Sequence, residues 1–427
     1  MKIRISIFFK ITAVVFIVFL FSKCVTTTKT TVKNNLSSIY NPSSHALHPL
    51  FRVFNETEQE TKIYLKLFTN ELLFSKANKE GTEKTLITVD YVAKPTFRSE
   101  VLLDSGSFSF TLRKSAKQTS MVTFLKISKV QEKKYVVEIN VTDKNSGKKS
   151  KTFVEVDRND SNPLQNYIPF QFNNNKPLFQ NWIHKNDTLL IKQNKVDANT
   201  LFVKYYKTDF SIPLPPFTSL STFSNDIKPD SVWTLPYKEG AIFSSKIPGI
   251  YILRNDSNAK LGLVQTNFSE NFPELKTSAQ LLESLQYLLS SEEYLNIKKS
   301  DTKKLEIDNF WLKTVNNTDK ARENLKIWYG RATYSNYYFT SYIEGWKTDR
   351  GMIYMVFGPP PIVNQTDGAE RWRYNDSRTG KNVDFIFIKK ENSISENDYI
   401  LQREYDYRTI WYNSIDSWRS GIVYSIP

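Results

Sequence analysis

The sequence predicts a multidomain protein in which two β-sandwich domains of immunoglobulin-like architecture precede an α+β domain with several helices and a small sheet. The chain has 427 residues, enough for about two to four domains of ordinary size. Apolar and polar residues alternate in short segments as far as residue 265, which is typical of half-buried strands. After Pro273 the apolar spacing becomes that of amphipathic helices.

Composition excludes several classes of protein. Hydrophobic residues at 40% and charged residues at 24% indicate a folded chain. A single Cys rules out a disulfide framework, and with three His and 13 Gly there is little for metal chemistry or phosphate-binding loops. The formal charge of +14 is spread along the chain without a basic stripe. We therefore expect no cofactor, no metal and no nucleic-acid partner.

The N-terminus has the layout of an export signal. Three basic residues flank an apolar run over residues 11–21, which is too short to span a bilayer comfortably, and the single cysteine, Cys24, follows. This order resembles the signal of bacterial lipoproteins of the Bacteroidetes type. The resemblance implies that 1–23 is a cleaved signal peptide and that Cys24 carries acyl chains such as palmitate, which would anchor the protein permanently. The alternative is an uncleaved anchor helix.

Residues 24–48 are polar, and we predict a flexible tether there. Surface lipoproteins of Bacteroidetes resemble one another in having acidic residues just after the lipidated Cys, and no acidic residue occurs in 25–44. We therefore expect an outer-membrane protein on the periplasmic face.

The two sandwiches are predicted over 49–157 and 164–265, separated by a segment rich in Asp, Asn, Ser and Pro. In the first domain we expect strands near 62–69, 86–92, 101–112, 121–127, 135–141 and 152–156. In the second we expect strands near 188–192, 201–206, 210–214, 231–235, 241–243 and 249–254.

Two strand-entry sequences resemble the O-glycosylation pattern of Bacteroidetes. They are Asp187-Thr188-Leu189 and Asp230-Ser231-Val232. The resemblance implies modification of the Thr188 or Ser231 hydroxyl, and an ordinary turn before a strand is the alternative.

Residues 274–427 are predicted as the α+β domain. Helices are expected near 277–289, from 291, and over 301–315, 318–339 and 408–419, with short strands or helical turns near 370–374, 383–389 and 399–405. The segment 352–357 stays undecided: capping residues before it favour a helix, whereas its Ile, Tyr and Val content favours a strand.

One motif in this domain is specific. It reads Glu344-Gly345-Trp346-Lys347-Thr348-Asp349-Arg350-Gly351, followed by Gly358-Pro359-Pro360, and six of the eight Trp lie in the last third of the chain. This resembles the GWxTD domain, a family of unassigned biochemistry common in Bacteroidetes envelope proteins. The resemblance covers about 281–421, with Trp372 and Trp418 also in place. It implies no catalytic residues.

The motif also has a direct physical interpretation. Gly345 follows a long helix and suits the position at which a positive φ is needed. Trp346 offers a large apolar face that would hold the helix end on the core. Thr348 and Asp349 have side chains that accept hydrogen bonds from backbone N–H groups at a helix start or turn.

Arg350 has three candidate partners, namely Asp349, Glu344 and Glu370. These features are what a structural corner requires, and a ligand- or partner-binding surface is the alternative. The residues assigned to this structural or partner-binding motif are Gly345, Trp346, Thr348, Asp349, Arg350, Gly351, Trp372 and Trp418.

The function we predict is that of a non-enzymatic scaffold or accessory subunit of an envelope protein complex, of the kind that assembles or secretes outer-membrane proteins. An aromatic surface of the C-terminal domain would bind the partner protein. The first alternative is a glycan- or peptidoglycan-binding module that stacks sugars on exposed Trp346, Trp372 or Trp418. The second is a hydrolase that uses a carboxylate pair from the set Glu344, Asp349, Glu370 and Glu404.

Overall fold

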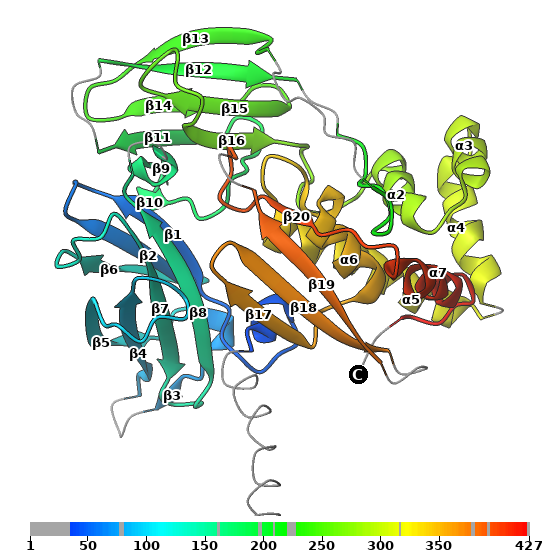
Figure 1. Ribbon diagram of the computed structural model, residues 1–427, viewed down its shortest axis with the longest axis horizontal. Helices are drawn as coiled ribbons and strands as arrows, with labels where there is room; N and C mark the ends of the chain where they lie inside the picture. The colour runs from blue at the N-terminus through cyan, green and yellow to red at the C-terminus, as the bar shows by residue number, and fades with distance from the viewer. Residues whose placement is uncertain are drawn as a thin grey trace, which may run out of the picture. The chain divides into compact units, whose positions relative to one another are not determined.

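Strands β1 to β8 form the first sandwich in the computed structural model (Figure 1). The structure describes residues 35–76, 81–159, 163–194, 199–207, 210–219, 228–315, 317–376, 381–390 and 393–424. One sheet has the order β1-β2-β6, and the other has the order β3-β4-β7-β8 with β5 beside β4. The bounds are β1 (Leu50–Asn55), β2 (Thr61–Phe68), β3 (Ser75–Lys76), β4 (Glu83–Lys94), β5 (Asp104–Arg113), β6 (Ser120–Ile127), β7 (Lys134–Asp143) and β8 (Lys149–Asp157).

Alternation of apolar residues decides which face of each strand is buried. In β2, Ile63, Leu65 and Leu67 are buried while the residues between them are half-exposed. A strand turns successive side chains to opposite faces, so this spacing directs one row into the space between the sheets. The predicted sandwich over this part of the chain is confirmed.

The second sandwich packs a sheet of order β10-β9-β11-β14 on one of order β13-β12-β15-β16. Its strands are β9 (Tyr167–Gln171), β10 (Lys176–Pro177), β11 (Thr188–Gln193), β12 (Thr200–Tyr206), β13 (Ser231–Pro236), β14 (Ala241–Ser244), β15 (Gly249–Arg254) and β16 (Leu263–Asn267). The strand expected over 210–214 is not formed. Arg403 donates instead to the carbonyl oxygens of Leu214 and Pro215, and the prolines in this segment cannot donate to a ladder.

The C-terminal domain combines six α-helices with the antiparallel sheet β17-β18-β19-β20 in the described part of the chain. The bounds are α2 (Ser278–Ser284), α3 (Ser291–Lys299), α4 (Lys303–Thr314), α5 (Thr318–Phe339), α6 (Asp349–Phe357), α7 (Tyr407–Arg419), β17 (Ile362–Thr366), β18 (Ala369–Asp376), β19 (Lys381–Lys389) and β20 (Tyr399–Leu401). The predicted α+β class is confirmed. The undecided segment 352–357 lies in α6, so the capping residues prevail over β propensity.

The segment just before the first strand differs from the predicted tether. Cys24, the signal segment 1–23 and the first part of the tether lie outside the described residues. From Leu36 onward the chain is folded: Ser37–Tyr40 form a 3-10 turn, and Leu36 is buried in the core of the C-terminal domain. The tether prediction failed here because the few apolar residues of a mostly polar segment are the ones that pack. Among the described residues, no helix is long and apolar enough to cross a membrane.

The three domains contact one another through polar bonds. Asn55 of β1 donates to Asn166 at 3.2 Å, which joins the two sandwiches. Lys389 of β19 forms an ion pair with Glu155 of β8 at 2.5 Å, which joins the small sheet to the first sandwich. The domains are therefore held together by specific contacts as well as by the chain.

The start of α3 is tied to the end of α7, and this contact predicts a pH dependence. Both nitrogens of the Arg419 fork bind the Glu293 carboxylate, at 2.8 and 2.9 Å. These bonds, together with the Ser290 cap, lower the pKa of Glu293 to about 2 although burial opposes the shift. The unfolded-state pKa is about 4.3, so the ion pair stabilises fully above that pH and is lost as the pH falls toward 2.

We expect Glu293→Gln to lower the free energy of unfolding by about 0.5–1 kcal/mol at pH 7, because the pair is partly exposed. At pH 3 the loss should be smaller. Denaturant unfolding at the two pH values measures the difference, and Glu292→Gln, a neighbouring exposed glutamate, is the control. An equal loss at both pH values would contradict the role of this ion pair.

Candidate functional site

Thr348 starts α6 as its N-cap. Its hydroxyl accepts from the backbone N–H of Gly351 at 3.0 Å and donates to the carbonyl oxygen of Gly345 at 2.7 Å. The first bond satisfies one of the free N–H groups at the helix start, as the sequence predicts. The second bond ties the helix start to the preceding 3-10 turn, Gly345–Lys347.

The two glycines of the motif allow backbones to approach closely. A Cβ on Gly345 would lie 1.9 Å from the carbonyl oxygen of Ser335 in α5, and a Cβ on Gly351 would lie 1.9 Å from the carbonyl oxygen of Gly345. The expected positive φ at Gly345 is wrong; at the end of α6 it is Gly358 that has it, with φ 84°. Gly345 is thus needed for space rather than for a left-handed conformation.

Asp349 links the start of α6 to the last strand of the sheet. Its carboxylate accepts from the backbone N–H of Leu401 at 2.8 Å and forms an ion pair with Arg403. Burial raises the pKa of Asp349, and the charge of Arg403 opposes that rise. Asp349 does accept a backbone N–H bond, but the predicted donor at a helix start or turn is wrong, because the N–H belongs to Leu401 in β20.

Arg350 is 2% exposed and pairs with Glu370, one of its three candidate partners, at 3.4 Å. Its guanidinium also donates to the side chain and backbone oxygens of Asn397 and lies over the Tyr399 ring, 4.0 Å from the ring centroid. A planar guanidinium satisfies several acceptors and an aromatic face at once, which makes a buried arginine tolerable.

Glu370 collects three donors from different parts of the chain. Besides Arg350, the Trp372 indole N–H donates to one carboxylate oxygen and the Tyr40 hydroxyl donates to the other at 3.0 Å. Burial and the neighbouring Glu370 charge raise the pKa of Tyr40 well above its usual range, so the hydroxyl stays protonated as a donor. Tyr354 donates in turn to the Tyr40 carbonyl at 2.9 Å. The motif thus holds the N-terminal segment against the C-terminal domain.

Tyr40 and Asn397 belong to this cluster although the sequence did not predict them there. Tyr40 lies 330 residues from Glu370, and Asn397 lies in an irregular loop, so no local pattern connects them to the motif. A signal for Tyr40 was nevertheless present: Leu36, Ile39 and Tyr40 form an apolar group in an otherwise polar segment.

The tryptophans of the domain are core residues. Trp346, Trp372 and Trp418 are each 0% exposed, and Trp311, Trp328 and Trp411 are also buried. The Trp418 indole N–H donates to the Val356 carbonyl at the end of α6 at 2.9 Å. Stacking of sugars on Trp346, Trp372 or Trp418 is therefore wrong, because a ring without exposed surface cannot form a binding platform. The same burial leaves these rings no surface to offer to a protein partner.

The carboxylates considered for hydrolysis have other bonding partners. Glu344 and Glu283 both bind the Lys347 ammonium group, at 2.8 Å each. Asp349 and Glu370 bind arginines as described above, and exposed Glu404 accepts from Gln402 at 3.0 Å. No group of three or more His, Cys, Asp or Glu in the described residues is arranged to hold a metal ion.

The two O-glycosylation candidates lie where their strands begin. Thr188 is half-exposed at the first position of β11, and Ser231 is exposed at the first position of β13. Asp187 accepts from the His184 backbone N–H at 2.8 Å, and Asp230 accepts from that of Lys207 at 2.7 Å. Both aspartates are thus engaged in turn hydrogen bonds, and the Ser231 hydroxyl is the more accessible of the two.

An exposed aromatic surface lies instead on α7 and on the turn just before it. Tyr405 is 69% and Tyr412 is 48% exposed, and the Arg408 guanidinium lies 5.8 and 5.9 Å from their ring centroids. Beside them is a hollow of about 670 Å³, which we call the α7 groove. Its lining includes Ile212, Pro213, Leu214, Pro215, Leu288, Leu289, Trp411, Tyr412, Ile415 and Arg419.

Comparison with protein families supports the motif-based interpretation. Residues 249–420 match the GWxTD domain, a longer span than the motif resemblance covered, and the match begins at β15 of the second sandwich. No curated protein matches the chain. The buried corner around Gly345–Lys347 and α6 lies inside the matched span. The chain is therefore a GWxTD domain-containing protein.

Proposed function

We propose that this protein is a lipoprotein of the outer membrane, anchored through acyl chains on Cys24 and facing the periplasm. There it acts as a non-enzymatic scaffold or accessory subunit of an envelope protein complex, in outer-membrane protein assembly or secretion. Its C-terminal domain binds the partner protein.

The observation that carries the proposal is the exposed Tyr405–Arg408–Tyr412 surface beside the α7 groove. Tyr and Arg are enriched among the residues that dominate binding energy at protein interfaces. Leu214 is 49% exposed on the groove, so an apolar contact is available next to the aromatic one. Because the motif tryptophans are buried, this surface takes the partner-binding role that the sequence analysis assigned to them.

The partner experiment compares two tyrosines of similar exposure. Full-length protein is affinity-purified from detergent-solubilised envelopes as wild type, Tyr412→Ser and Tyr334→Ser. Tyr334 is 39% exposed on α5 and lies outside the α7 groove. A residue that dominates binding is worth at least 2 kcal/mol, so we expect Tyr412→Ser to weaken partner recovery about thirtyfold and Tyr334→Ser to leave it unchanged. Recovery of the wild-type protein alone, or equal losses in both variants, would count against the α7 surface.

A second arm of the experiment tests the anchor. Cys24→Ser removes the only thiol of the chain, so the acyl chains cannot be attached. We expect this variant to leave the outer-membrane fraction or to keep its signal segment, as seen by fractionation and intact mass. A variant that fractionates and is processed like the wild type would refute lipid anchoring.

A further inference from the structure

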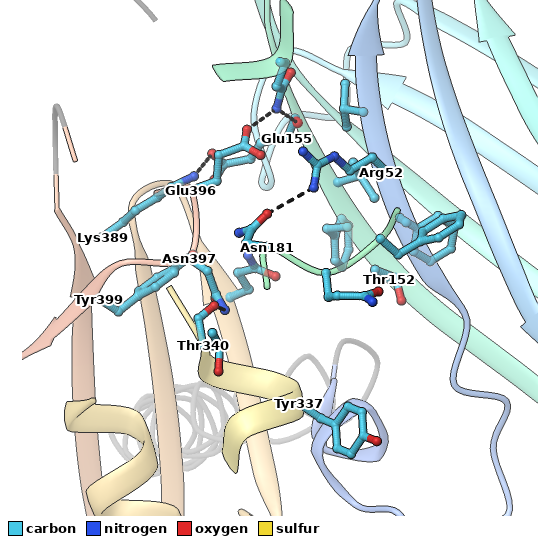
Figure 2. Close-up of a pocket in the computed structure, with 18 of the residues that line it drawn as sticks. Arg52, Thr152, Glu155, Asn181, Tyr337, Thr340, Lys389, Glu396, Asn397 and Tyr399 are labelled. Carbon is cyan, nitrogen blue, oxygen red and sulfur yellow. Dashed lines mark hydrogen bonds and ion pairs between the residues drawn. The ribbon is translucent and has the colours of Figure 1, made fainter. Parts of the chain in front are cut away.

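A polar cavity of about 360 Å³ lies where the three domains meet (Figure 2). One wall is formed by neighbouring strands of the first sandwich, β1 and β8, and the segment 179–182 of the second domain forms another. The C-terminal domain supplies further side chains, among them Tyr337, Thr340, Lys389, Asn397 and Tyr399. This volume is within the range of small-ligand sites in proteins.

Arg52 of β1 is a cation without an anionic partner in this cavity. Its Nη1 donates to the Asn181 side chain oxygen at 3.0 Å, and no carboxylate in the described part of the chain forms an ion pair with it. Burial lowers the pKa of Arg52, and the charge of Glu396 opposes this shift at longer range. A half-buried guanidinium bound to one neutral amide is left with donors that suit a carboxylate.

The other charged groups of the cavity are already engaged. Lys389 forms its ion pair with Glu155, and Gln165 donates to Glu396 at 2.5 Å and to the Glu155 carbonyl at 2.9 Å. Figure 2 shows these bonds on one side of the cavity, with Arg52 directed toward Asn181. An incoming anion would therefore meet Arg52 without displacing an existing ion pair.

Part of the strand wall of the cavity has backbone groups that lie outside the sheet ladders. β1 and β8 are the outermost strands of their sheets on this side. In β8, Gln165 already binds the Glu155 carbonyl and the Asp157 N–H from outside the sheet. The same alternation directs the backbone groups of Phe153, which lines the cavity, away from β7. In β1, the Glu56 N–H donates to the Glu60 carbonyl, so the alternation directs the backbone groups of Phe51 and Val53, which also line the cavity, away from β2. Open strand edges bind extended peptides through main-chain hydrogen bonds.

We propose that this cavity binds an extended peptide that ends in a free carboxylate, with the carboxylate on Arg52 and the peptide backbone against Phe51 and Val53 of β1 and Phe153 of β8. Asn181 orients the guanidinium. Tyr337, which is 59% exposed, gives apolar contact to the peptide side chains. The site shares no residue with the α7 groove and stands independently of the partner surface proposed above.

The test uses the full chain in detergent and a mixture of N-acetyl tripeptides with varied side chains. Equilibrium dialysis with mass-spectrometric readout measures binding of the free acids and of the same peptides with C-terminal amides. We expect the acids to bind at least about tenfold more tightly than the amides, since hydrogen bonds to charged groups are the stronger class. We also expect Arg52→Gln to remove that preference, while Arg322→Gln, an exposed arginine at the start of α5, keeps it.

Several outcomes would overturn the proposal. Equal binding of acids and amides by the wild-type protein would contradict the role of Arg52. This comparison needs no variant, so it does not depend on whether Arg52→Gln folds stably. Loss of the preference in Arg322→Gln as well would indicate a general charge effect. Binding of glucuronate oligosaccharides in a parallel dialysis, with no binding of peptides, would assign the cavity to acidic saccharides instead.

Discussion

Gly351→Ala is expected to lower the free energy of unfolding by about 3 kcal/mol, whereas Gly330→Ala is expected to raise it by up to about 1 kcal/mol. Both glycines lie inside helices, Gly351 in α6 and Gly330 in α5. A Cβ on Gly351 would lie 1.9 Å from the Gly345 carbonyl oxygen, but a Cβ on Gly330 meets nothing within 4 Å. Alanine at position 351 therefore forces two backbone segments apart, whereas alanine at position 330 only improves helix propensity.

Denaturant unfolding of the two variants measures this contrast. Helix propensity favours alanine over glycine at both sites, so opposite signs of the two stability changes would report the close approach of α6 to the preceding turn. Similar stability changes for both variants would show that the motif glycine is not required for space.

Arg350→Met is expected to lower the free energy of unfolding by about 3–5 kcal/mol, because it leaves the Glu370 carboxylate buried without its cation. Arg371→Met is the matched control, since Arg371 is the next arginine along the chain and also forms an ion pair, with Asp384, but is 45% exposed. Exposed ion pairs contribute about 0–1 kcal/mol.

The double variant Arg350→Met/Glu370→Gln separates the charge effect from loss of packing. Replacing the carboxylate removes the uncompensated charge, so we expect the double variant to recover part of the stability lost in Arg350→Met. Equal losses in Arg350→Met and Arg371→Met, or no recovery in the double variant, would contradict the importance of this buried pair.

The sandwiches and the helices could be predicted because their signals are local. Ile63, Leu65 and Leu67 alternate within one strand, and Thr277 and Ser290 cap helices that begin at the next residue. Thr348 caps α6 in the same way. Each of these signals needs only a few neighbouring residues, so the period of the side chains and the chemistry of the cap are sufficient.

The candidate sites could not be predicted in the same way, because their members come together from distant parts of the chain. Arg52 and Asn181 are separated by 129 residues and Tyr40 and Glu370 by 330. Exposure on α7 depends on which face of the helix is covered, so Tyr412 is exposed while the adjacent Trp411 is buried.

The amino-acid sequence alone was enough to predict two sandwiches, an α+β domain and its GWxTD motif. Strand alternation, helix caps and the motif are local features of the chain. Only the tertiary structure decided what the individual residues of these domains contact. It placed the motif tryptophans in the core, made Gly345 a point of close approach, joined Tyr40 to Glu370 and left Arg52 facing a cavity. Burial and pairing depend on neighbours far along the chain, and only the packed structure brings those neighbours together.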